Sequence, residues 1–188
     1  MNTVYAINGP VIKLRKTKEF AMREMVYVGE KKLIGEVIGV NDEFTIIQVY
    51  ENTAGLKIGE KVEGTGAPMS VTLGPGIISD MFDGIARPLK KMVETDGCYV
   101  TEGSSISTVD FSREFDVTVT VSVGDILEAG MVFATCPESP LIVNKAMIPP
   151  NFGKCQVVWT AENGKYHPND TIIKVKCGGE EISLDLCQ

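Results

Sequence analysis

Short stretches of alternating apolar and polar residues fill the first 73 positions of the chain, and turn-forming residues separate them. The alternation predicts strands at residues 4–7, 11–14, 25–28, 33–40 and 44–50, with a last strand inside the glycine-rich stretch 56–69. The polar clusters at 29–32 and 41–43 suit hairpin connections. About six short strands without helical periodicity favour a small closed β-barrel, because closure removes exposed strand edges. We place this barrel at residues 1–72.

The spacing of apolar residues changes from alternating to helical after the Gly-Pro-Gly sequence at 74–76. The apolar positions that follow are Ile77, Ile78, Met81, Phe82, Ile85 and Leu89. This stripe predicts a short helix that Gly84 can end and that Pro88 blocks. We expect a linker with a short helix over residues 73–107, and the polar turn clusters within residues 92–110 favour a domain boundary there.

The β pattern returns in the second half of the chain. Residues 115–123 alternate strictly between apolar and polar, as a half-buried strand does. Two stretches, 123–134 and 164–175, share a turn-then-strand shape and flank a crossing segment at 142–150. Two related halves of this kind are typical of a barrel sandwich such as a biotinyl or lipoyl carrier. We therefore predict a mainly β chain whose second domain, at residues 108–188, is barrel-sandwich-like.

Four sequence blocks carry a resemblance to a known family. They are LIGEVI at 33–38, IQVYENTAGL at 47–56, GTGAPMSV at 64–71 and the junction LGPGIISDMFDGIARPL at 73–89. Together they resemble the catalytic A subunit of V-type and archaeal A-type rotary ATPases. The resemblance covers nearly the whole chain and implies an N-terminal β-barrel followed by the region that is called the bulge, or non-homologous region, of that subunit. Because the chain stops before any phosphate-binding loop, it is similar to an N-terminal fragment of a longer subunit.

The resemblance also implies a function and partners. The intact subunit is expected to hydrolyse or make ATP and to couple this reaction to proton or sodium transport, with ATP and Mg bound beyond Gln188. The fragment itself is expected to hold no catalytic, cofactor-binding or metal-binding residue. The implied partners are B subunits in an alternating ring and peripheral-stalk (stator) subunits, in a complex that is cytoplasmic and peripheral to the membrane. The competing hypothesis is a free-standing two-barrel binding or carrier module.

Composition narrows the function classes. Hydrophobic residues make up 44% of the 188 positions and charged residues 23%, which suits a folded globular chain. The net charge of −7 argues against nucleic-acid binding, because phosphates reward clustered Lys and Arg. No run approaches the roughly 20 apolar residues of a membrane helix, and the N-terminus lacks a secretion signal pattern. Neither GxxxxGK[ST] nor GxGxxG occurs, so we expect no phosphate-binding loop.

Four residues are candidates for chemistry, and each has a simpler interpretation. Lys145 could carry a biotinyl or lipoyl group, but its neighbours are Asn144 and Ala146 rather than methionines, which favours an ordinary solvated lysine. His167 is the only histidine, so it has no second histidine for a metal or a proton relay. Asp80 and Asp83 would share one side of the predicted helix, where acidic residues stabilise the helix start.

The five cysteines are odd in number and show no CxxC spacing. This pattern disfavours a disulfide framework and a zinc site. The cysteines are Cys98, Cys136, Cys155, Cys177 and Cys187, and the apolar surroundings of Cys136, Cys155 and Cys177 predict small core residues in a reducing cytoplasm. The apolar stripe of residues 77–89 is too short to form a stable helix alone, so we expect it to fold back on the β domains or to pair with a second copy.

Overall fold

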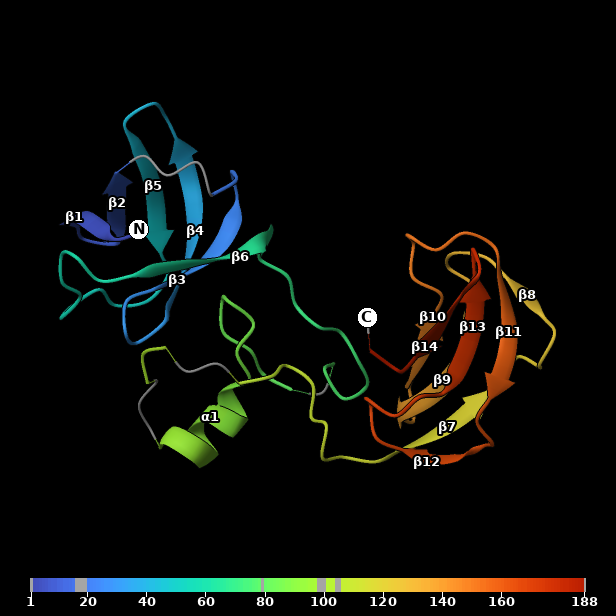
Figure 1. The fold of residues 1–188 in the computed structure, drawn as a ribbon. Helices are drawn as coiled ribbons and strands as arrows, with labels where there is room; N and C mark the ends of the chain where they lie inside the picture. Colours follow the sequence, from blue (N-terminus) through green and yellow to red (C-terminus); the bar gives the residue numbers. More distant parts are fainter. Residues whose placement is uncertain (1, 16–19, 79, 98–100, 104–105, 188) are drawn as a thin grey trace. The chain divides into compact units, whose positions relative to one another are not determined.

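The computed structural model describes residues 2–15, 20–78, 80–97, 101–103 and 106–187 (Figure 1). The chain divides into two compact units. The first consists of residues 1–71 and 82–106, and the second of residues 72–81 and 107–188. The segment between the two predicted domains is therefore shared, with its first part in the second unit and its later part in the first.

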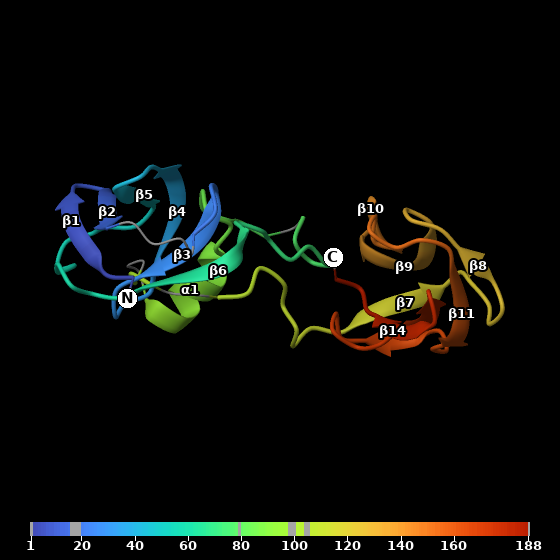
Figure 2. The same ribbon diagram turned by 45° about the horizontal axis from the view of Figure 1, so that its top comes forward.

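Six antiparallel strands form the first unit, in the spatial order β1-β2-β5-β4-β3-β6. Their bounds are Val4–Asn8 (β1), Val11–Arg15 (β2), Glu24–Val28 (β3), Leu33–Val40 (β4), Phe44–Val49 (β5) and Val62–Pro68 (β6). An isolated bridge between Thr3 and Lys61 brings the two outermost strands together. On either side of it, the Val4 N–H donates to the Glu60 carbonyl and the Val62 N–H donates to the Asn2 carbonyl, each at 2.8 Å. The sheet thus curls into a barrel (Figure 2).

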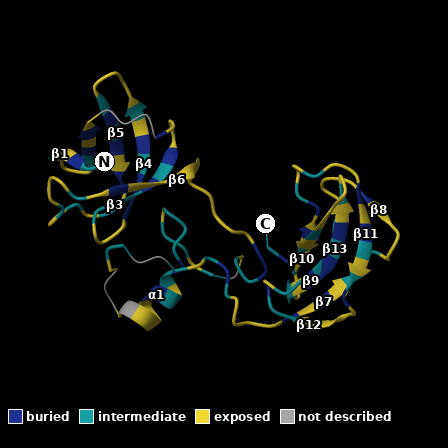
Figure 3. Cartoon of the chain, viewed as in Figure 1, coloured by how far each residue is buried: buried dark blue, intermediate teal, exposed yellow. Residues whose placement is uncertain are grey.

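The barrel core comes from the alternating pattern of its strands (Figure 3). Each strand contributes apolar side chains that are almost fully buried: Val4, Ile12, Leu14, Val26, Val28, Leu33, Val37, Ile47, Val49 and Val62. Gly35 allows β4 and β5 to approach closely, because a Cβ there would lie 2.9 Å from the Gln48 carbonyl oxygen. A register shift between Val37 and Gly39 bends β4 around this core.

Two four-stranded antiparallel sheets form the second unit, in the orders β10-β9-β7-β12 and β14-β13-β11-β8. Their bounds are Phe115–Val119 (β7), Ile126–Leu127 (β8), Val132–Ser139 (β9), Ile142–Met147 (β10), Cys155–Thr160 (β11), Gly164–Tyr166 (β12), Ile173–Cys177 (β13) and Glu180–Leu184 (β14). One apolar cluster draws on both sheets: Val117, Leu127, Phe133, Ala134, Ala146, Ile148, Cys155, Val157, Ile172, Ile173, Val175 and Leu186. The alternation predicted over residues 115–123 is confirmed for β7, where Phe115 and Val117 are buried while Asp116 and Thr118 are exposed. The strand ends at Val119, and Val123 is exposed. The predicted fold class, a β-barrel and a barrel-sandwich-like domain joined by a segment with a short helix, is confirmed.

The helix lies later than the apolar stripe predicted, so the placement within residues 77–89 was wrong. The described residues of 77–88 form turns, a bend and an isolated bridge between Phe82 and Pro88. Helix α1 spans Leu89–Asp96 and begins directly after Pro88, whose backbone is extended. The fixed φ of a proline suits the start of a helix better than its interior, and this explains the shift. The side chain of Met92 on α1 is almost fully buried.

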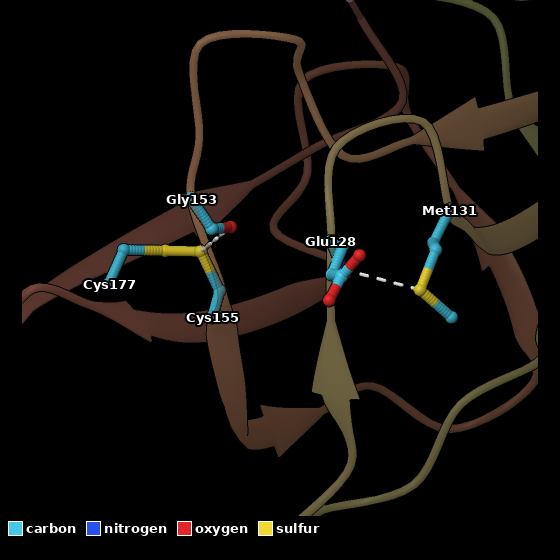
Figure 4. The surroundings of a disulfide bond; sticks show 5 residues. All are labelled: Glu128, Met131, Gly153, Cys155 and Cys177. Carbon is cyan, nitrogen blue, oxygen red and sulfur yellow. Dashed lines mark hydrogen bonds between the residues drawn. A yellow bond between two sulfur atoms is a disulfide. The ribbon is translucent and has the colours of Figure 1, made fainter.

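The prediction about the cysteines was partly wrong. Cys155 on β11 lies directly opposite Cys177 on β13, with their Cα atoms 4.5 Å apart, and the two form a disulfide (Figure 4). They are 22 positions apart, and sequence spacing alone gives no strand register, so it could not reveal the pair. Cys136 is a free, buried core residue as predicted, Cys187 is free and partly exposed, and Cys98 lies outside the described residues.

Candidate functional site

The structure does not bring the residues that could carry chemistry into one site. Lys145 lies in the middle of β10 opposite Thr135, with its side chain exposed. A carrier lysine is presented at the tip of a hairpin, and the β9–β10 tip is instead formed by residues 140–141. Asp80 belongs to the second unit and Asp83 to the first, so they share no helix.

His167 lies in a turn of the second unit. Its Nε2 atom is 3.8 Å from Glu114 Oε1, and its backbone N–H donates to Asp170 Oδ2 at 2.7 Å. Across the described parts of the chain, no group of three or more His, Cys, Asp or Glu side chains is arranged to hold a metal ion. The turn is therefore held together by local hydrogen bonds.

A buried ion-pair network lies where the Arg87 turn meets the barrel. The Arg87 guanidinium donates from Nη1 to Glu51 Oε1 and from Nε to Asp83 Oδ2, each at 2.7 Å. The side chain of Glu51 is only 3% exposed and that of Arg87 is 12% exposed. Glu51 also accepts the backbone N–H groups of Ile34 at 2.9 Å and Gly103 at 3.0 Å. One carboxylate therefore joins β4, the Arg87 turn and the segment that follows α1.

Asp83 shapes the turn that presents Arg87. Its Oδ1 atom accepts the backbone N–H groups of Ile85 at 3.0 Å and Arg87 at 2.8 Å. Burial by itself would raise the pKa of Asp83, but the bonds from the Arg87 backbone and side chain and from the Ile85 backbone outweigh it and hold the pKa below its usual value. These partners favour the ionised carboxylate, which strengthens its pairing with Arg87.

The segment after α1 has a second attachment to the barrel. Lys31 forms an ion pair with Glu102. Next to it, Gly103 has a positive φ of 73°, and a Cβ there would overlap the Lys31 carbonyl oxygen. Only glycine fits this close approach. The Arg87 turn and residues 102–103 are thus attached to the barrel by an ion-pair network, an exposed ion pair and a glycine contact.

A hollow of about 220 Å³ lies at the turn end of the barrel, lined by residues that include Glu30, Lys31, Gly55, Lys57 and Glu60. The Glu60 carboxylate accepts the backbone N–H groups of Lys57 at 2.8 Å and Glu30 at 3.1 Å. These N–H groups are of the type that would cradle a phosphate, and here a carboxylate of the chain occupies them.

Two family profiles match the chain in order. The profile described as "ATP synthase alpha/beta family, beta-barrel domain" matches residues 4–66, and that described as "ATPsynthase alpha/beta subunit barrel-sandwich domain" matches residues 106–188. The chain belongs to the ATP synthase alpha/beta family. Its two domains are the ones that the family profiles name, and this confirms the resemblance drawn from the four sequence blocks.

The chain is similar over nearly its whole length to alpha chains and A subunits of V-type enzymes. It is 46% identical over 188 residues to "V-type ATP synthase alpha chain 2" of Clostridium tetani, covering 100% of this chain and 32% of that protein. It is 43% identical to "V-type ATP synthase alpha chain" of Halothermothrix orenii, covering 90% and 29%. It is 39% identical to the catalytic A subunit of the V-type proton ATPase of Cyanidium caldarium, covering 96% and 31%. The chain therefore spans about a third of the length of these relatives.

Sequence reasoning did not find the Glu51–Arg87 pair. The two residues are 36 positions apart, in two different blocks of the family resemblance, and the blocks do not show which side chains meet. The available signal was Arg87 beside Pro88, between the apolar residues Ile85 and Leu89, since a charged residue that packs among apolar ones needs a partner.

Proposed function

We propose that this chain is the N-terminal part of the catalytic A subunit of a V-type or A-type ATPase. The complete subunit would hydrolyse or synthesise ATP with Mg and couple that reaction to proton or sodium transport. The observation that carries the proposal is the ordered pair of a β-barrel and a barrel-sandwich domain in one chain, together with whole-chain similarity to A subunits.

The part described here would serve assembly. We propose that the barrel, with its limits at residues 1–72, joins barrels of B subunits in a collar, while the barrel-sandwich domain at 108–188 faces the stator. The attachment of Arg87 and Gly103 to Glu51 of the barrel supports this role, because a collar must be connected to the domain that follows. The ATP site would lie elsewhere, since this sequence lacks GxxxxGK[ST].

We also propose that contact with the membrane is made through other subunits of a cytoplasmic, peripheral complex. Among the described residues, no helix has the length and apolar character needed to cross a membrane. The carrier alternative has less support, because Lys145 lies within a strand and the matching families are those of ATP synthase.

Co-expression tests this function directly. The complete subunit that begins with this chain would be produced with the B subunit of the same organism and weighed by native mass spectrometry. We expect an alternating ring that hydrolyses Mg-ATP. Complete subunits that stay monomeric beside B, under conditions where both are folded, would contradict the proposal.

A further inference from the structure

Two aromatic and two cationic side chains form one cluster on the outside of the barrel. They are Tyr5 on β1, Lys13 and Arg15 on β2, and Phe44 on β5, and we call them the aromatic–cation face. The rings of Tyr5 and Phe44 stack with their centroids 5.6 Å apart and an interplanar angle of 29°. Arg15 Cζ lies 4.7 Å from the centre of the Tyr5 ring, and Lys13 Nζ lies 5.8 Å from that of Phe44.

Strand register places Lys13, Arg15 and Phe44 on the same side of the sheet, and ring stacking on Phe44 places Tyr5 with them. β1, β2 and β5 are neighbours in the sheet, and Arg15 lies directly opposite Phe44. Because side chains alternate along β2, Ile12 and Leu14 fill the core while Lys13 and Arg15 point outward. Tyr5 is 42% exposed, so the barrel core does not need its ring.

The charges of this face are available to a partner. Within the residues that the structure describes, neither Lys13 nor Arg15 forms an ion pair with a carboxylate. A guanidinium stacked on a ring keeps its in-plane N–H groups free to donate, and their fork matches a carboxylate. The stacking also restricts the Arg15 side chain before any partner arrives, which lowers the entropic cost of binding.

We propose that the aromatic–cation face binds a carboxylate-bearing surface of the neighbouring subunit's barrel; this inference rests on the proposed ring. The partner would place an Asp or Glu against Arg15 and apolar atoms against the two rings. A head-to-tail ring needs two different faces on each barrel, and this cluster supplies one of them. Nucleic acid is the less suitable partner, because the chain as a whole carries a net charge of −7.

Charge reversal in the complete subunit tests the inference. The double variant Lys13→Glu with Arg15→Glu would be compared with the control Lys32→Glu with Lys57→Glu, which changes the net charge equally on exposed residues outside the face. Association with the B subunit would be measured by light scattering at low and high salt. We expect the face variant to weaken association about tenfold or more and to lose most of its salt dependence, while the control stays within about twofold.

A second variant and two controls make the result unambiguous. Tyr5→Ser leaves both cations in place but removes the ring on which Arg15 stacks, so it should also weaken association. This variant tests the inference if the charge-reversed barrel does not fold. Failure of the wild-type subunit to associate with B would reject the proposed function and this inference together. Association of both folded face variants at the wild-type level would reject this inference alone. Saturable binding of a 20-nucleotide oligo-dT that disappears in the charge-reversed variant would also overturn it, in favour of nucleic acid.

Discussion

Replacement of Arg87 by methionine should destabilise the first unit strongly. Methionine keeps much of the length of the side chain but leaves the Glu51 carboxylate buried without its cation. Breaking a buried ion pair by removing one partner costs about 3–5 kcal/mol. Glu51 would keep the N–H groups of Ile34 and Gly103, so we expect the lower end, about 3 kcal/mol. For a domain of about 100 residues this corresponds to a fall in Tm of about 12 °C or more.

Urea titration with hydrogen exchange provides the assay. Exchange of backbone amides resolves the two units, so the second unit serves as an internal reference in the same molecule. Arg87→Lys keeps the charge but loses the two-pronged donor, and we expect it to fall between the wild type and Arg87→Met. The matched control is Lys31→Met, whose exposed ion pair with Glu102 should contribute no more than about 1 kcal/mol.

The double-mutant cycle decides whether the pair is coupled. Arg87→Met combined with Glu51→Gln should cost clearly less than the two single changes added together, because the second change removes the unpaired charge. An Arg87→Met variant within about 0.5 kcal/mol of the wild type, or strictly additive effects in the cycle, would refute the reasoning.

Four further predictions concern other parts of the chain. Reduction of the Cys155–Cys177 disulfide, or its replacement by two serines, should destabilise the second unit by about 3 kcal/mol. The cause is the entropy of the unfolded loop that the disulfide closes, whose ends are 22 positions apart. Thermal unfolding with and without a thiol reductant measures the effect. Thr45→Val should stabilise the first unit by about 1 kcal/mol in urea titration, because this 1% exposed threonine has a hydroxyl without a hydrogen-bond partner among the described residues. Because the pKa of Asp83 is lowered from its usual value of 3.8, its ionised carboxylate stabilises the folded state at pH values above 3.8. This stabilisation is lost as the pH falls through the lowered pKa. Asp83→Asn should therefore lose less stability than the wild type between pH 7 and pH 3. Intact-mass analysis of protein from its native host should show Lys145 unmodified, and a biotinyl or lipoyl mass increment at that residue would revive the carrier hypothesis.

The alternation of apolar and polar residues predicted the strands, because which face of a strand is buried can be read from residues adjacent in sequence. Phe115 and Val117 alternate with Asp116 and Thr118, and that alternation alone identifies the buried face of β7. The helix was misplaced because the apolar spacing before Pro88 does not require one buried face, and Ile78 and Met81 are exposed. The tertiary contact that holds this turn, between Glu51 and Arg87, has no counterpart in local periodicity.

Register explains what else the sequence could not show. Cys155 and Cys177 pair only because β11 and β13 align in one register, and a shift of one residue would place them on opposite faces. The aromatic–cation face has the same origin. Lys13 and Arg15 are visible in the sequence as part of a short basic cluster, but their stacking on Tyr5 and Phe44 depends on the order β1-β2-β5.

The central claim is that this chain is the N-terminal part of a catalytic A subunit, and the gene sequence downstream of the Gln188 codon tests it most directly. The account predicts that the reading frame continues into a nucleotide-binding domain with a GxxxxGK[ST] segment. A stop codon immediately after Gln188, with no such segment in frame, would contradict it.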